Sequence, residues 1–161
     1  MSKEHSYNTT VTWTGNKGTG TSNYRAYDRD HVISVEGKPD IPGSSDPAFR
    51  GNKTRYNPED SLVAAASACH MLWYLHLCSE NNVVVEKYVD HAAGRMIENA
   101  DGSGQFSEII LRPNITIRKQ EMKEKAMSLH HEANRLCFIA RSVNFPIHHE
   151  PEIVVSDGID S

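Results

Sequence analysis

The stretch NPEDSLVAAASACHMLWYLHLC, residues 57–78, decides how the rest of this sequence is interpreted. It opens with helix-start signals: Asn57 is a good N-cap, Pro58 suits the first helical position, and the acidic pair that follows favours the positive end of the helix dipole. It continues through small residues that allow another backbone to approach closely. We therefore expect a central helix over residues 57–80, with Cys69 near its middle.

The cysteines determine which chemistry this helix can carry. Spacing alone favours a plain core role for Cys69, because free cysteine is among the most buried residue types. Cys78 lies about 13 Å further along the helix axis and half a turn around it. A disulfide needs Cα atoms within roughly 7 Å, so these two cannot bond within one continuous helix. Cys137, in a second predicted helix, could bond to Cys69 if the helices cross there. The predicted apolar stripe of the first helix comprises Leu62, Ala65, Ala66, Cys69 and Trp73 or Leu72.

The totals exclude several classes of protein. The chain has 161 residues, of which 38% are apolar and 24% charged, so one folded domain is expected rather than disorder. A net charge of −4 argues against a nucleic-acid partner. The polar N-terminus predicts no secretory signal, and the apolar run 62–78 is short for a membrane span. Three cysteines argue against a disulfide framework. A cytoplasmic protein without a membrane partner is expected.

The remaining pattern predicts grouped strands and a second helix, which is an α+β arrangement. We expect residues 1–161 to form a single domain. Its predicted parts are N-terminal strands in 1–35 (Thr9–Gly15 paired with Thr21–Asp28, then His31–Val35), a long functional loop 36–56, strands over 83–98 and 106–119 with a kink at Pro113, a second helix over 120–143, a last strand 152–156 and a tail 157–161.

The helix motif resembles that of the OsmC/Ohr family, the osmotically inducible protein C and organic hydroperoxide resistance proteins. NPEDSLVAAASAC is similar to the family's Asn-Pro-Glu-Glu…Ala-Cys helix start, including the step of ten residues from Glu59 to Cys69. Cys137 matches the second family cysteine in order and placement, and FRG, residues 49–51, resembles an arginine-bearing segment of the OsmC branch. The resemblance implies antiparallel sheets packed around two long helices in an intertwined homodimer.

The same resemblance implies a thiol peroxidase for organic hydroperoxides, and in some members hydrogen peroxide, with no metal or organic cofactor. Cys69 would be the peroxidatic thiolate and Cys137 the resolving thiol. Arg50 and Glu59 would be the polar pair beside Cys69, because a guanidinium favours a thiolate and a carboxylate can orient the guanidinium. The resulting sulfenic acid would condense to a disulfide, which an external dithiol must reduce.

The spacing within the helix adds an expectation about assembly. Ten residues put Glu59 and Cys69 about 15 Å apart along the axis of one helix. They cannot share a pocket within one chain unless the helix breaks. We therefore expect Glu59 and Arg50 to come from the partner chain of an obligate homodimer. Arg25, Arg29 and Arg55 are alternative arginines, of which Arg29 and Arg55 are interpreted as surface charges.

Two residues depart from the family pattern. Phe138 stands where proline commonly follows the second cysteine, and His70 stands where an aromatic residue often follows the first. Neighbouring residues on a helix do not face each other, so His70 is interpreted as an outer or interface group rather than the base. Phe49, Trp73 and Phe138 are candidates to line a pocket for the organic part of a hydroperoxide.

Alternative readings share the same fold, so the fold cannot separate them. One is a non-catalytic dimer that binds a small apolar ligand, and another is a thiol redox sensor. The nine histidines raise a metal reading, but the pairs His130–His131 and His148–His149 lack the spacing of strong metal sites. Solvated or interface histidines, with no metal, are expected.

Overall fold

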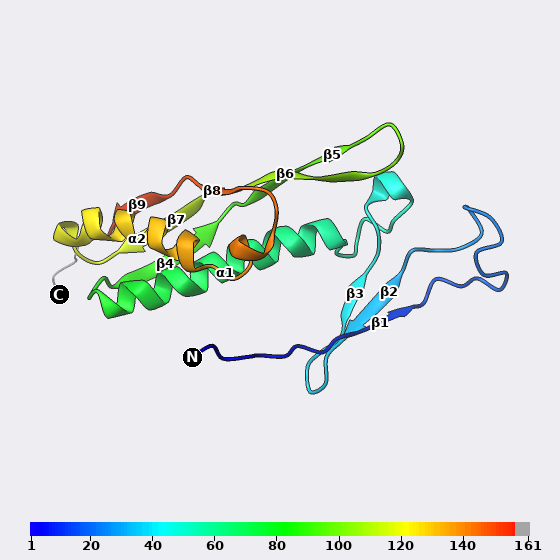
Figure 1. Cartoon of the computed structure of the whole chain (residues 1–161), viewed down its shortest axis with the longest axis horizontal. Helices are drawn as coiled ribbons and strands as arrows, with labels where there is room; N and C mark the ends of the chain where they lie inside the picture. The colour runs from blue at the N-terminus through cyan, green and yellow to red at the C-terminus, as the bar shows by residue number, and fades with distance from the viewer. Residues whose placement is uncertain (157–161) are drawn as a thin grey trace. The chain divides into compact units, whose positions relative to one another are not determined.

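The computed structural model describes residues 1–156 (Figure 1), so the predicted tail 157–161 lies outside the described residues. The chain divides into two compact units, residues 1–61 and 62–161. We refer to them as the first and second unit and describe each by itself.

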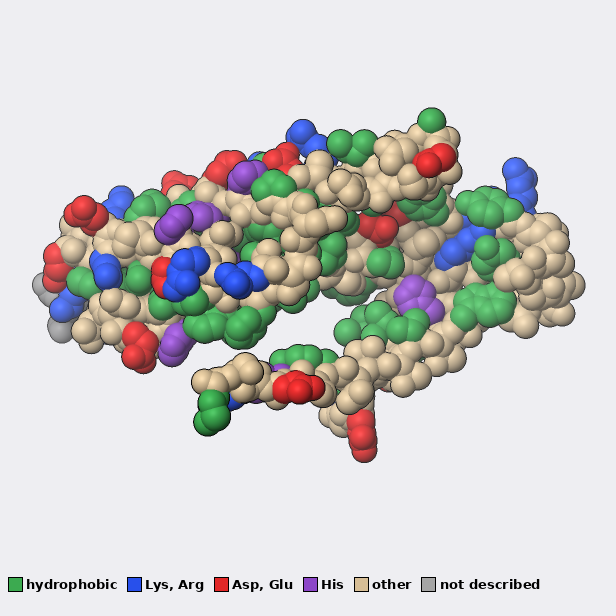
Figure 2. Space-filling view, in the orientation of Figure 1, with side chains coloured by type: hydrophobic (Ala, Val, Ile, Leu, Met, Phe, Trp, Pro, Cys, Tyr) green, Lys and Arg blue, Asp and Glu red, His purple; other side chains and the backbone are tan. Residues whose placement is uncertain are grey.

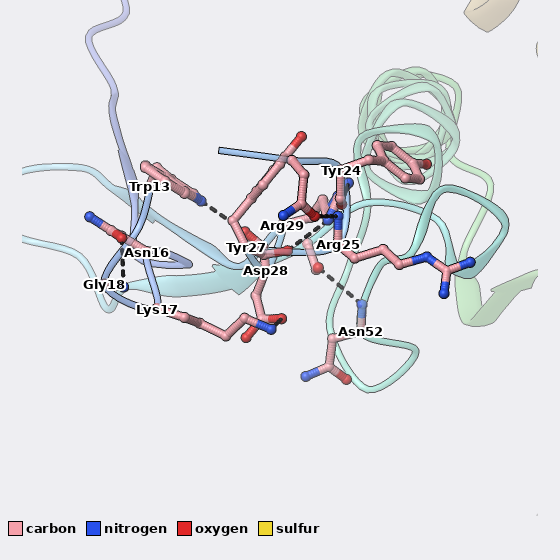
Figure 3. A network of polar contacts seen from close by, with 12 residues as sticks. Trp13, Asn16, Lys17, Gly18, Tyr24, Arg25, Tyr27, Asp28, Arg29 and Asn52 are labelled. Atoms are coloured by element: carbon pink, nitrogen blue, oxygen red, sulfur yellow. Dashed lines mark hydrogen bonds and ion pairs between the residues drawn. The ribbon is translucent and has the colours of Figure 1, made fainter. Parts of the chain in front are cut away.

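The first unit contains a three-stranded antiparallel sheet of β1 (Thr10–Trp13), β2 (His31–Ser34) and β3 (Ile41–Gly43). The prediction that residues 21–28 form the return strand of a hairpin is wrong, because β2 pairs with β1. Residues 21–28 form turns instead. The guanidinium of Arg29 donates hydrogen bonds to the carbonyls of Tyr24 and Tyr27, which satisfies them locally instead of in a strand ladder (Figure 3).

The central helix α1 spans Pro58–Glu80. Its predicted N-cap is confirmed, because the Asn57 side-chain oxygen accepts a hydrogen bond of 2.8 Å from the Asp60 N–H. The predicted stripe is displaced by about one residue. The helix is apolar around most of its circumference, so the sequence pattern could not identify the face that packs. The buried residues follow a spacing of four: Ala66, His70, Tyr74 and Cys78.

Within residues 1–156, α1 is the one helix long and apolar enough to cross a membrane, by length and composition alone. The helix that meets these criteria, Pro58–Glu80, is longer than the apolar run 62–78 on which the expectation rested. Core helices of soluble proteins meet the same criteria. In this fold, one face of α1 packs against the strands and the second helix of the second unit.

Each of the two long strands predicted in the second unit is two shorter strands. The first separates into β4 (Val85–Asp90) and β5 (Ala93–Glu98), and the second into β6 (Gly104–Leu111) and β7 (Pro113–Ile117). The kink at Pro113 is confirmed. Asp90 stabilises this bend, because its two carboxylate oxygens accept hydrogen bonds from the Arg112 N–H at 2.7 Å and the Ser67 hydroxyl at 2.5 Å.

The bend divides the strands between two sheets. One has the order β4-β7-β9, with β9 at Glu152–Val155, and the other has the order β5-β6-β8, with β8 at Ile147–His149. β9 pairs parallel to β7, and β8 pairs parallel to β6. The expectation of purely antiparallel sheets is therefore wrong, and β8 was not predicted. The chain reaches both parallel strands after the second helix, which acts as the crossover that parallel pairing requires.

The second helix is shorter than predicted. A 3-10 turn at Gln120–Met122 leads into α2 (Lys123–Leu136), and another 3-10 turn lies at Ala140–Ser142. Cys137 is therefore the C-cap of α2 rather than an interior residue. α2 and α1 enclose the main core with β4, β7 and β9 (Figure 1). The buried members of that core are Tyr74, Cys78, Val83, Ile115, Ile117, Ala126, Leu129, Ala133 and Ile153.

Two core tyrosines provide a matched test of buried hydrogen bonding. The Tyr74 hydroxyl donates to the carbonyl of Ala126 at 3.0 Å. The Tyr88 hydroxyl is buried and finds no partner among residues 1–156. We expect Tyr74→Phe to lower the free energy of unfolding by about 1 kcal/mol, because it removes a buried hydrogen bond to a carbonyl that then keeps only its partner within α2. Tyr88→Phe should be neutral or slightly stabilising. Urea unfolding of both variants measures the difference, and equal losses would contradict it.

Candidate functional site

The structure brings two of the predicted site residues, Cys69 and Cys137, into contact. Both are free thiols; Cys69 is half-buried, whereas Cys137 is only 1% exposed. Burial raises the pKa of Cys137 to about 11, and the neighbouring Cys69 thiol contributes to that rise. Cys137 therefore remains a protonated thiol near neutral pH. Cys69 is therefore more exposed than the plain core role favoured by its spacing predicts, whereas Cys78 and Cys137 are buried.

The end of α2 holds Cys137 in place. The Cys137 N–H closes the last turn on the carbonyl of Ala133 at 2.9 Å, while φ −62° and ψ 116° turn the chain out of the helix. The Ala140 N–H then donates to the Cys137 sulfur at 3.4 Å, which acts against the rise in the pKa of Cys137. One backbone hydrogen bond thus fixes the main chain of Cys137 and another fixes its sulfur.

An aromatic pair lies beside the two thiols. Trp73 follows Cys69 by one helical turn and Phe138 follows Cys137 directly, and their rings meet edge to face with centroids 5.5 Å apart. Phe138 is 66% exposed. Trp73 also lines an apolar hollow of about 220 Å³ with Leu72 and His76. An apolar surface therefore adjoins the half-buried sulfur.

The predicted residues Phe49 and Arg50 belong to the first unit. A 3-10 turn at Pro47–Phe49 ends at Arg50, whose φ of 65° is a left-handed conformation that non-glycine residues rarely adopt. The turn is closed by the Asp46 side chain, which accepts a hydrogen bond from the Ala48 N–H at 2.7 Å. The local backbone thus fixes Arg50 at the end of the turn, on the loop predicted to be functional.

The alternative arginines of the first unit differ in how they are engaged. Arg29 stacks on Tyr24 and Tyr27, with its guanidinium 4.5 Å and 4.0 Å from the ring centroids (Figure 3). Arg55 pairs with Asp30 at 3.4 Å. Both are half-buried structural groups, so their interpretation as surface charges is wrong.

Arg50 and Arg25 are free for another role. Among residues 1–156, neither guanidinium makes a side-chain hydrogen bond or an ion pair, although that of Arg50 lies 6.0 Å from the ring centroid of Tyr24. Glu59 is in a complementary condition: its Oε2 atom is buried and has no hydrogen-bond partner among the described residues. A buried carboxylate oxygen without a partner is costly, so its environment is incomplete in a single chain.

Three histidines stack in the second unit, one of them directly after Cys69 in the sequence, and sequence reasoning missed this stack. His70 and His130 are fully buried, which contradicts the prediction of solvated histidines. The His70 Nε2 and His130 Nδ1 atoms lie 3.0 Å apart, and the rings are nearly parallel. His149 stacks on both from β8. Other histidine side chains, purple in Figure 2, reach the surface over α2 and β8. The available signal was that His130 lies four residues after buried Ala126 on one helix face.

Burial controls the protonation of this stack. It lowers the pKa of His70 to about 4 and that of His130 to about 3, and the neighbouring histidines act in the same direction. Both imidazoles are therefore neutral near pH 7. Within residues 1–156, no group of three or more His, Cys, Asp or Glu side chains is arranged to hold a metal ion.

Comparison with known proteins places this geometry in a family. Solved structures that the chain resembles include an OsmC-like protein of unknown function from Vibrio cholerae, with a TM-score of 0.83, 27% identity, and coverage of 92% of this chain and 99% of that one. An organic hydroperoxide resistance protein from Elizabethkingia anophelis matches at a TM-score of 0.70 and 16% identity, covering 97% and 100%. An organic hydroperoxide resistance protein, OsmC, from Legionella pneumophila matches at 0.66 and 15%, covering 94% and 100%. The fold is thus the α+β fold of these proteins.

Among curated proteins, none matches the sequence. The description of the OsmC-like protein family matches residues 51–152. That match covers more than half of the chain and includes both thiols in contact. The chain therefore belongs to the OsmC-like protein family.

Proposed function

We propose that this protein is a thiol-dependent peroxidase that reduces organic hydroperoxides through Cys69. The observation that carries the proposal is the contact between a half-buried thiol, Cys69, and a buried thiol, Cys137. An accessible sulfur beside a protected one suits a two-step cycle, in which the first is oxidised and the second resolves it. The names of the similar structures from Elizabethkingia and Legionella support the choice of substrate.

The proposed cycle balances at each step. The Cys69 thiolate attacks the outer peroxide oxygen, the O–O bond breaks, and the leaving alkoxide takes a proton to become the alcohol. Sulfur is oxidised to sulfenic acid and the peroxide is reduced. The Cys137 sulfur then displaces the sulfenic hydroxyl, and the proton of its thiol leaves with that hydroxyl as water. An external dithiol, of the kind that a reducing cytoplasm supplies, reduces the disulfide to two thiols by exchange.

The proposed active unit is a homodimer in which Arg50 and Glu59 of one chain serve Cys69 of the other. α1 is continuous from Pro58 to Glu80, so Glu59 and Cys69 lie about 15 Å apart along it. The unpartnered Oε2 of Glu59 and the free guanidinium of Arg50 would pair and face the reacting peroxide. Apolar residues of α1 remain exposed in the single chain and suit close helix packing against a second copy: Ala64, Ala65, Ala68 and Leu72.

The proposed substrate has an apolar body. The Trp73–Phe138 pair and the hollow beside it offer rings and methyl groups within reach of Cys69, with few polar groups. Such a surface favours an alkyl or aryl hydroperoxide over hydrogen peroxide, because binding the organic part removes apolar area from water. Phe49 would add a third ring next to Arg50. No cofactor is required by the chemistry.

A direct experiment tests the proposal. Reduced protein is mixed with one equivalent of cumene hydroperoxide, and thiol loss and peptide masses are followed. We expect a Cys69–Cys137 disulfide, with Cys78 still free, because Cys78 lies about 13 Å from Cys69 along the continuous helix α1 and cannot reach it. In Cys137→Ser, sulfenic acid or over-oxidised Cys69 should accumulate instead.

The outcomes separate the proposal from its alternatives. A protein that binds cumene hydroperoxide without losing thiols would be a binding module, and the peroxidase proposal would be abandoned. Disulfide formation without catalytic turnover in the presence of dithiothreitol would indicate a redox sensor. Turnover that survives Cys69→Ser would also overturn the proposal.

A further inference from the structure

Three contacts between α1 and α2 form an antiparallel ladder that ends at the cysteine pair. The first rung is the Tyr74 hydroxyl on the carbonyl of Ala126, at 3.0 Å. The second is the His70–His130 hydrogen bond, also 3.0 Å. The third is the contact between Cys69 and Cys137. The first two rungs are four residues apart on both helices, and the cysteine pair lies one residue from His70 on α1 and two turns after His130, at the end of α2.

The second rung is built more firmly than packing alone would require. The His70 and His130 rings are parallel within 5°, and the Tyr74 ring stacks on His130 with centroids 3.8 Å apart and 10° between the planes. His149 covers the stack from β8. A polar contact that is fully buried costs desolvation, which is offset only when its geometry is kept.

The cysteine pair is held less firmly by its own surroundings than the histidine pair is. Cys137 sits where α2 has already ended, and Cys69 is half-buried. His130 precedes Cys137 by two helical turns on the same face of α2, with buried Ala133 between them, and His70 follows Cys69 directly. The Trp73–Phe138 contact adjoins the two sulfur atoms but is largely exposed, so the histidine rung is the fully buried contact near them that can set how far apart they lie.

We propose that the hydrogen-bonded pair His70–His130 is a positioning device that holds Cys69 and Cys137 at the separation from which a disulfide forms. It acts on the resolving step of the proposed peroxidase and rests on that function for its biological use. Neither histidine touches the peroxide in this role. The pair sets the local concentration of one sulfur at the other, which governs disulfide formation with any oxidant.

The test measures that local concentration without a peroxide. Wild-type protein, His70→Leu and His130→Leu are equilibrated in mixtures of reduced and oxidised glutathione, and the Cys69–Cys137 disulfide is quantified by alkylation and mass. Glutathione disulfide takes up the two electrons and becomes two glutathione thiols, while the protein dithiol becomes a disulfide. We expect each leucine variant to lower the equilibrium constant about tenfold or more, because the helices are free to slide past an apolar contact.

Two further variants test whether the effect depends on the hydrogen bond between the two histidines. The double variant His70→Gln with His130→Asn places an amide near each ring nitrogen and should restore most of the equilibrium constant, whereas a role in packing volume alone would not be rescued by it. His131→Leu, at an exposed position next to His130, is the matched control and should equal the wild type. Circular dichroism confirms that each variant is folded before comparison.

The outcomes distinguish this proposal from the peroxidase itself. Folded leucine variants with an unchanged equilibrium constant would overturn the positioning role, even if the wild type proves to be a peroxidase. Failure of the double variant to recover would also overturn it. If the wild type fails to consume hydroperoxide but shows these shifts with glutathione, the positioning role stands and the peroxidase proposal falls.

Discussion

Mixing two inactive variants, Cys69→Ser and Arg50→Leu, should restore about a quarter of the wild-type peroxidase activity, since half of the randomly formed dimers are mixed and each holds one complete site. Alone, Cys69→Ser should lose all turnover, because it lacks the nucleophile. Alone, Arg50→Leu should lose roughly 10²–10³-fold in kcat, which is typical of removing one group that stabilises developing charge. In the proposed dimer, restoration follows because the site that keeps Cys69 would receive Arg50 from the other chain.

The mixing experiment requires subunit exchange and one further control. Variants are mixed under mild denaturation and refolded together, and cumene hydroperoxide consumption is followed with a dithiol reductant. A chain carrying both substitutions, mixed with Cys69→Ser, should stay inactive. If Arg50 acts on the thiol of its own chain, the first mixture also stays inactive, and the shared-site proposal fails. Arg25→Leu tests the other arginine of the first unit that has no side-chain partner, and this variant should retain activity.

The helix start and the cysteines were predictable because short-range physics determines them. Asn57 caps α1 as its residue type indicates. The exclusion of a Cys69–Cys78 bond follows from helical geometry, and α1 is continuous through both residues. The contact between Cys69 and Cys137 depended on where two helices pack, which the pattern left open and the structure decides.

The errors arose where tertiary contacts override local pattern. The strand predicted over residues 83–98 breaks at Asp90. There the carboxylate accepts hydrogen bonds from Ser67 and Arg112 in place of strand-to-strand hydrogen bonds. Both partners are distant in sequence, so the local pattern could not reveal them. Strand β8 is only three residues long, and it pairs parallel with β6 after the crossover connection that contains α2. The histidine stack joins three elements, so no spacing in the sequence could predict it.

Lowering the pH from 7.5 to 5 should destabilise the fold by about 2 kcal/mol for each of the two buried histidines, a loss that follows from proton linkage. Above pH 6.5 these side chains are neutral in both states, and the stability is fully present. As the pH falls below 6.5, the histidines of the unfolded chain take up protons. Those of the folded chain do not, because their pKa values are lowered to about 4 for His70 and about 3 for His130. The free energy of unfolding therefore falls with pH.

The groups around the stack do not offset this loss. Burial lowers the pKa of His149 as well, with the charges of His131 and His148 acting in the same direction, and the Tyr74 ring that covers His130 is neutral over this range. Cys78 and Tyr88 lie next to Tyr74, and burial raises the pKa values of both. Glu108 lies 3.8 Å from His148, at the surface.

Urea unfolding at pH 7.5 and pH 5, at one protein concentration, measures the effect. In His130→Asn, the pH-dependent loss should shrink by about 2 kcal/mol, because this buried site no longer takes up a proton on unfolding. In His131→Asn, the exposed neighbour, the loss should equal that of the wild type. An unchanged loss in His130→Asn would show that the stack is not the origin of acid sensitivity. A stack that stays neutral in the folded chain down to pH 5 leaves the His70–His130 contact intact at the pH values where the thiols work.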